Sequence, residues 1–120
     1  MQRIVVLNPK GGSGKTTIAI NLASYLAVKG LRPVLMDYDP QGSSIRWLKK
    51  RAPPLPLIHG IAAYERNGRT TRSFQLRPPG DSLCQVVDTP AAIEPHEMPE
   101  LTRGADAILV LHVALAGAID

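Results

Sequence analysis

Apolar residues along this chain fall into short continuous runs and into stretches with helical spacing. Residues 3–7 form an apolar, β-branched run, which predicts a buried strand of a parallel sheet. From Lys15 onward apolar residues recur at helical spacing, and Gly30 stands where that helix would end. The helical positions are Ile18, Leu22 and Leu26. The opening segment therefore predicts a strand, a glycine-rich loop and a helix.

The same alternation of strand and helix patterns continues along the chain. Further strands are predicted at residues 33–36, 83–88 and 107–111, and further helices at residues 43–51 and 96–103. Strands that alternate with helices indicate a parallel sheet covered on both faces. The predicted fold class is therefore α/β, with a mostly parallel sheet and helices on both of its faces.

Residues 52–80 interrupt this regular pattern, because they are rich in Pro, Gly, Arg and Thr. Within them, Leu57-Ile58 and residues 73–76 predict short strands, and a brief helix is expected near residues 61–66.

The composition sets limits on the class of protein. With 120 residues and 44% hydrophobic content, the chain is expected to form one modest domain over residues 1–120. Cys84 is the single cysteine, which excludes an intramolecular disulfide and metal sites of the multi-cysteine kind. The apolar run at the N-terminus is shorter than a secretion signal or a membrane span. We therefore expect a cytoplasmic protein without a membrane anchor.

The net charge of +4 conceals an uneven distribution along the chain. Residues 41–80 carry eight Lys or Arg against one Glu, whereas residues 81–120 carry one Arg against seven acidic residues. A basic middle third can attract nucleic acid or another polyanion, although a solvated basic face is the simpler interpretation. Trp47 and the basic residues around it can form a face that stacks on bases and binds phosphates. In the simpler interpretation Trp47 packs inward against the sheet and the charges are solvated, and this is the one we expect. His59, His96 and His112 lack metal-ligand spacing and are expected at the surface or in loops.

A glycine-rich segment between the first strand and the first helix has the context that a P-loop requires. Glycines let the backbone turn its N–H groups around phosphate oxygens, and the helix that follows adds the positive end of its dipole. Lys15 is expected to reach the β- and γ-phosphates, and the Thr16 hydroxyl to bind Mg²⁺. The predicted phosphate-binding residues are Gly11, Gly12, Ser13, Gly14, Lys15, Thr16 and Thr17. The first glycine of the usual pattern is displaced, so this is a deviant P-loop.

Three segments carry a further likeness: residues 10–17 (Lys-Gly-Gly-Ser-Gly-Lys-Thr-Thr), 37–43 (Asp-Tyr-Asp-Pro-Gln-Gly-Ser) and 86–91 (Val-Val-Asp-Thr-Pro-Ala). In order and spacing they resemble the ParA/MinD family of deviant-Walker-A P-loop ATPases, over about residues 3–111. The Asp-Pro-Gln-Gly-Ser form is similar to the ParA branch, which segregates plasmids and chromosomes. The resemblance implies a P-loop NTPase fold, ATP and Mg²⁺ as ligands, and hydrolysis that acts as a dimerisation switch.

The resemblance also implies a role for individual residues outside the phosphate loop. Lys10 would reach across a dimer interface to the partner's nucleotide, and with Lys15 it would stabilise charge on the transferring phosphoryl group. Asp39 would position the attacking water, Asp37 would help to organise the Mg²⁺ shell, and Asp88 would hold the metal through water. The residue types alone leave simpler alternatives open: Lys10 as a solvated lysine, and each aspartate as a cap for the loop that follows its strand.

Several expectations concern the whole protein. The resemblance implies an ATP-dependent homodimer that serves partition or intracellular positioning, with non-specific DNA and a partition protein as partners and the nucleoid as a site of association. A different reading is a nucleotide-binding module without turnover that gates association with a partner protein. Ala92 stands where the family has a glycine in its second switch, which restricts the backbone there. The family continues beyond the last predicted strand, so this chain is expected to be an incomplete ATPase, or a truncated product without activity.

Overall fold

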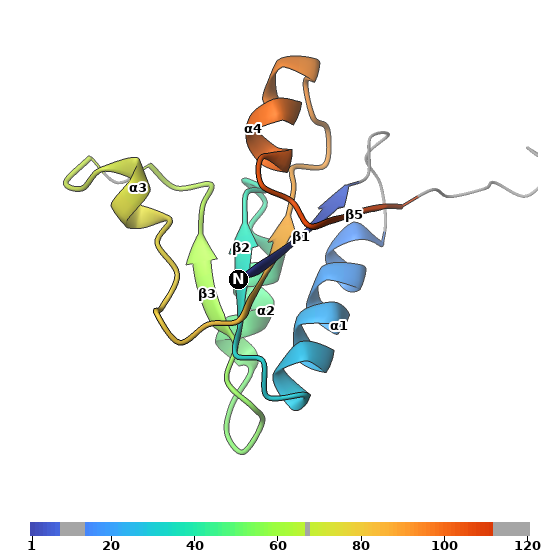
Figure 1. The fold of residues 1–120 in the computed structure, drawn as a ribbon, viewed down its shortest axis with the longest axis vertical. Coiled ribbons are helices and arrows are strands. Elements are labelled where there is room, and N and C mark those ends of the chain that lie inside the picture. The colour runs from blue at the N-terminus through green and yellow to red at the C-terminus, as the bar shows by residue number, and fades with distance from the viewer. Residues whose placement is uncertain (8–13, 67, 112–120) are drawn as a thin grey trace, which may run out of the picture.

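The computed structural model describes residues 1–7, 14–66 and 68–111, and its centre is a parallel β-sheet (Figure 1). The described strands are β1 (Gln2–Leu7), β2 (Pro33–Asp37), β3 (His59–Ala62), β4 (Cys84–Asp88) and β5 (Ala107–Val110). They lie in the order β3-β2-β4-β1-β5, and each neighbouring pair in this sheet is parallel. The structure thus confirms the predicted α/β class.

The longest described helix begins and ends where the sequence pattern predicts. The helices are α1 (Lys15–Val28), α2 (Ser43–Lys50), α3 (Arg72–Gln75) and α4 (Met98–Thr102), with a 3₁₀ turn η1 (Pro95–Glu97) before α4. At the end of α1, Gly30 has φ +79°, its N–H donates to Ala27 O, and the Leu31 N–H donates to Leu26 O. This pair of bonds closes a helix with a left-handed residue, a conformation that glycine adopts without steric cost.

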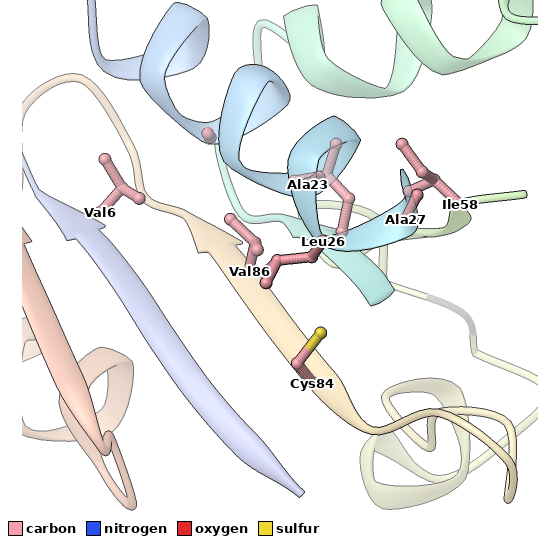
Figure 2. Packing of buried hydrophobic residues seen from close by; sticks show 9 residues of the cluster. Val6, Ala23, Leu26, Ala27, Ile58, Cys84 and Val86 are labelled. Atoms are coloured by element: carbon pink, nitrogen blue, oxygen red, sulfur yellow. The ribbon is translucent and has the colours of Figure 1, made fainter. Parts of the chain in front are cut away.

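The core lies on both faces of the sheet, because consecutive residues of each strand point to opposite sides. Figure 2 shows one face, where Ala23, Leu26 and Ala27 of α1 pack over Val6 of β1 and Val86 of β4. The opposite face carries a second buried cluster, against which shorter segments from the second half of the chain pack. Its strand residues are Val5, Leu7, Val34, Met36, Ile61 and Val87, and the packed side chains include Leu76, Ile93 and Met98. Helices cover both faces, as predicted.

The middle of the chain differs from the sequence-based expectation. The brief helix expected at residues 61–66 is wrong, because residues 59–62 form β3 and pair in parallel with β2. A ladder of inter-strand hydrogen bonds decides the conformation there, and a short local pattern does not detect it. The strand expected at residues 73–76 is also wrong. Thr71 caps α3 by accepting the N–H of Phe74, which starts a helical turn instead.

The strand β5 is one edge of the described sheet and pairs with β1. Its exposed apolar side chains are Ile108 at 46%, Leu109 at 42% and Val110 at 58%. These values set β5 apart from the inner strands β2 and β4, whose residues are almost all buried.

No helix in the described ranges is both long enough and apolar enough to cross a membrane.

Candidate functional site

The predicted site residues meet at the carboxyl edge of the sheet. Asp37 ends β2 and Asp88 ends β4, and these two residues are aligned partners across the parallel ladder. The helix α1 begins at Lys15, close to the end of β1, and α2 begins at Ser43 after the loop that follows β2. Ligands of open α/β sheets bind outside the carboxyl ends of the strands, so the topology places these residues where a ligand is expected.

Asp88 is the centre of the polar contacts at this edge. Its side chain is fully buried, and the ammonium group of Lys15 contacts its Oδ1 atom. The hydroxyl of Thr16 donates to Oδ2 at 3.0 Å, and the hydroxyl of Ser44 donates to the same oxygen. Donors from the starts of two helices therefore converge on one carboxylate, and the structure brings Lys15, Thr16 and Asp88 together. Their roles toward phosphate and Mg²⁺ stay predictions.

Lys15 is buried, with 3% of its surface exposed. Besides its contact with Asp88, its Nζ lies 3.8 Å from Oδ2 of Asp39. A buried ammonium group needs such partners because the loss of its water shell costs several kcal/mol. Lys15 is thus held between two carboxylates. Thr17, which is also a predicted phosphate-binding residue, lies at the surface.

Asp37 contacts the backbone at the start of α2. Its carboxylate accepts the N–H of Asp39 at 2.9 Å and the N–H of Ile45, the third residue of α2, at 3.3 Å. The residue before α2 is Gly42, which has no side chain to cap the helix, so Asp37 performs this function. These contacts match the alternative interpretation of Asp37 as a capping residue, and its role in the Mg²⁺ shell stays a prediction.

The burial of Asp37 changes its acidity. The pKa of this carboxyl is raised to about 6, first by its removal from water and then by the negative charges of Asp88 and Asp39. The backbone hydrogen bonds from Asp39 and Ile45 act in the opposite direction. Asp37 is therefore a carboxyl group whose charge depends on pH in the mildly acidic range.

Asp39 holds the shape of the loop that follows β2. Its Oδ1 accepts the N–H of Gln41 at 3.0 Å, and its main-chain oxygen accepts the N–H of Gly42 at 2.8 Å. An aspartate that bonds to the backbone two residues later forms an Asx turn. Asp39 is only 8% exposed and faces Lys15, so it lies beside the cation that would neutralise a phosphate.

The N-terminus of α1 fits an anionic group. Gly14 precedes the helix with φ +102°, and a Cβ atom at this position would lie 3.0 Å from Leu111 Cδ2. The first turn of α1 contains no acidic residue, and no side chain caps it in the described part of the chain. Its N–H groups and the positive end of the helix dipole favour a phosphate. Lys10, Gly11, Gly12 and Ser13 lie outside the described residues.

The oxygen atoms near Lys15 also fit Mg²⁺. The Thr16 hydroxyl and the Asp88 carboxylate are 3.0 Å apart, and Mg²⁺ binds through one or two such protein oxygens together with water and phosphate oxygens. Among the described residues, no group of three or more His, Cys, Asp or Glu side chains is placed to hold a metal by itself. The donor set therefore suits a metal that arrives with a phosphate group better than a metal held by protein alone.

Sequence reasoning missed Ser44, which is fully buried on Asp88. Its position directly after the 37–43 segment was the available signal, but serine at the start of a helix usually indicates a cap. Trp47 is partly buried against the cluster beneath α1, as expected, and His59 and His96 are exposed, as expected. His112 lies outside the described residues.

Comparison with known proteins identifies relatives across most of the chain. The family model of the CobQ/CobB/MinD/ParA nucleotide binding domain matches residues 4–116. The maintenance of carboxysome distribution protein A of Gloeobacter kilaueensis is 40% identical over 107 residues, which are 89% of this chain and 47% of that protein. A putative replication protein A of Sinorhizobium fredii is 56% identical over 99 residues, 81% of this chain and 24% of that protein.

A third relative is more similar over a shorter segment. The chromosome-partitioning ATPase Soj of Thermus thermophilus is 56% identical over 52 residues, which cover 43% of this chain and 21% of that protein. The chain therefore spans about half the length of the first of these relatives and about a quarter or less of the other two.

Proposed function

Because this chain belongs to the CobQ/CobB/MinD/ParA family of nucleotide-binding domains, we propose that it binds Mg²⁺·ATP and hydrolyses it as a dimerisation switch. The observation that carries the proposal is the convergence of Lys15 and Thr16 on the buried carboxylate of Asp88, at the start of α1, which no side chain of the described residues caps. A buried cation, a hydroxyl and a carboxylate at a helix N-terminus are the groups that a metal-bound triphosphate requires.

Each residue of the site has a distinct task in this proposal. Lys15 binds the β- and γ-phosphates, while Thr16 and Asp88 hold Mg²⁺, which neutralises phosphate charge when it is bound. Asp39 positions the attacking water, and Lys10 completes the site from the partner protomer. Catalysis then comes from placement and charge stabilisation, with no covalent intermediate.

The contacts of Lys15 suggest how nucleotide binding reaches the loop after β2. Lys15 contacts Asp88 and lies 3.8 Å from Asp39, which in turn holds the backbone of Gln41. Phosphate oxygens compete with these carboxylates for the same ammonium group. When Lys15 turns to the phosphates, Asp39 loses its cation and becomes available for the water, so that binding and loop conformation are coupled.

The cellular task that we propose is partition or another positioning process. In support, relatives of this chain include a chromosome-partitioning ATPase and a protein for maintenance of carboxysome distribution. Non-specific DNA is the proposed polyanion, because Lys49 and Lys50 are exposed at the end of α2 and can contact phosphates. We also propose a partition protein as a partner of this chain and the nucleoid as a site of association.

The test measures binding and turnover in the same preparation. A fluorescent ATP analogue is titrated with Mg²⁺ and with EDTA, and phosphate release is followed with Mg²⁺·ATP. We expect Mg²⁺-dependent binding and measurable phosphate release. Binding without release would favour the alternative, a module that gates a partner without turnover, and absence of binding would reject both.

A further inference from the structure

Ser44 is the donor on Asp88 that neither the P-loop pattern nor the 37–43 segment predicts. Its side chain is fully buried, and its hydroxyl donates to Oδ2 of Asp88. Serine at the start of a helix commonly bonds to the backbone of that helix. Here Asp37 already accepts the N–H of Ile45, so the cap of α2 comes from another residue. The Ser44 hydroxyl connects α2 to the end of β4 instead.

The three donors on Asp88 differ in whether they also bind a ligand. Under the proposed function, on which this inference rests, Lys15 also binds phosphate and Thr16 also binds Mg²⁺. Ser44 lies on a different helix, and the proposed function assigns it neither phosphate nor Mg²⁺. We propose that Ser44 is a positioning residue, which keeps the Asp88 carboxylate oriented toward the metal when Lys15 and Thr16 turn to the nucleotide.

The physical basis is the orientation of a metal-binding carboxylate by a neighbouring hydrogen bond. Such outer-shell partners hold the rotamer of the ligand, and their loss costs about 10- to 100-fold in metal affinity or activity. Without nucleotide, Asp88 still has the contacts from Lys15 and Thr16. Removal of the Ser44 hydroxyl therefore affects the site only when those two residues are engaged elsewhere.

The experiment compares the chain with its S44A variant. A fluorescent ATP analogue is titrated in EDTA, and in separate samples without EDTA Mg²⁺ is added stepwise at a fixed concentration of the analogue. We expect unchanged affinity in EDTA, but about a tenfold higher Mg²⁺ concentration for the half-maximal effect. The melting temperature is expected to fall, because a buried hydrogen bond to a carboxylate is lost. Turnover is not needed for this readout.

Ser82→Ala is the matched control, since Ser82 is also buried but lies just before β4, at the opposite end from Asp88. This variant is expected to keep the Mg²⁺ dependence of the unmodified chain. An S44A curve that coincides with that of the unmodified chain would overturn the inference. A loss of affinity in EDTA as large as the loss with Mg²⁺ would also overturn it, because it would indicate a merely structural role. Failure of the unmodified chain to bind nucleotide would instead reject the proposed function.

Discussion

Lys15 is a buried cation whose present partners are both carboxylates. The change Lys15→Gln removes the positive charge and keeps a side chain of similar length. We expect it to remove most of the Mg²⁺·ATP affinity, by about 1.5–3 kcal/mol of binding free energy, because hydrogen bonds to charged groups contribute that much. Titration with a fluorescent ATP analogue measures the loss. Lys49→Gln, at an exposed lysine of α2, is the control, and equal affinity of both variants would exclude Lys15 from the phosphate site.

Substitutions of Asp39 and of Lys10 are expected to impair different steps, hydrolysis in the first case and dimerisation in the second. Asp39→Ala should bind ATP and accumulate a nucleotide-bound dimer, because it removes the group that positions the water and leaves the phosphate contacts intact. Lys10→Ala should bind ATP and lose the dimer, because the proposed contact to the partner's phosphates is absent. Light scattering with ATP gives the mass of each variant. If both variants remain monomeric in the same way, the separate roles are wrong.

Asp37 gives the stability of the chain a distinctive pH dependence. Its pKa is about 6 when folded, against 3.8 for a free aspartate, so between these values the folded state binds more protons than the unfolded state. The contribution of Asp37 to stability is therefore largest below about pH 4 and is lost as the pH rises through 6. Asp37→Asn removes this dependence.

The measurement is urea unfolding of the chain and its Asp37→Asn variant across this range, in EDTA and without nucleotide. The unfolding free energy of the unmodified chain should fall, relative to the variant, by up to about 1.4 kcal/mol per pH unit. Other carboxyl groups cancel in this difference. Parallel curves for the two proteins would show that Asp37 titrates normally when folded.

Among the elements, the contact between β3 and α2 depends on a glycine. A Cβ atom at Gly60 would lie 2.7 Å from Leu48 Cδ1 and 3.2 Å from Ile45 Cδ1, so Gly60→Ala forces the ends of these two side chains of α2 to shift. We expect a loss of about 1–3 kcal/mol in unfolding free energy, the usual cost of overpacking. Urea unfolding provides the measurement. Gly80→Ala is the control, because nothing lies within 4 Å of its Cβ position, and equal stability of the two variants would contradict the packing argument.

The elements that could be predicted from sequence are those with a strong local signal. The apolar runs of β1, β2 and β4 and the helical spacing of α1 are such signals, and Gly30 marked the end of α1 correctly. The strand β3 has no comparable signal. It contains His59 and Gly60, both exposed, and it exists because β2 offers it a ladder of hydrogen bonds. Pairing between distant segments is not encoded in a local pattern.

For the site, the proximity of Lys15, Thr16 and Asp88 could be predicted because motif spacing and parallel topology fix it together. The capping contact of Asp37 and the contact of Ser44 could not be decided from sequence. Both depend on the angle at which α2 leaves its loop, and Gly42, with φ +65°, sets that angle. A sequence pattern does not determine the exit angle of a helix.

On the scale of the whole molecule, β5 lies at an edge of the sheet that the described residues form, and this edge is expected to promote association. An edge strand presents unpaired N–H and C=O groups, and Val110 on this one is 58% exposed. Val110→Lys should reduce self-association at high protein concentration, because a lysine on an edge strand opposes pairing with another chain. Sedimentation velocity in EDTA without nucleotide measures the degree of self-association. Leu57→Lys, at an 83% exposed loop position, is the control, and an equal effect would point to general hydrophobicity instead.

The single thiol of this chain lies far from the site, and this position makes it a natural reporter. Cys84 is 2% exposed at the start of β4, between β1 and β2, and burial raises the pKa of its thiol. A thiol reagent therefore reacts only when the centre of the sheet opens, so the labelling rate measures the population of open molecules. A ligand that binds only the closed form slows that reaction in proportion to its affinity. The labelling rate of Cys84, at the start of β4, thus reports nucleotide binding at the carboxyl ends of the strands, without a label in the site.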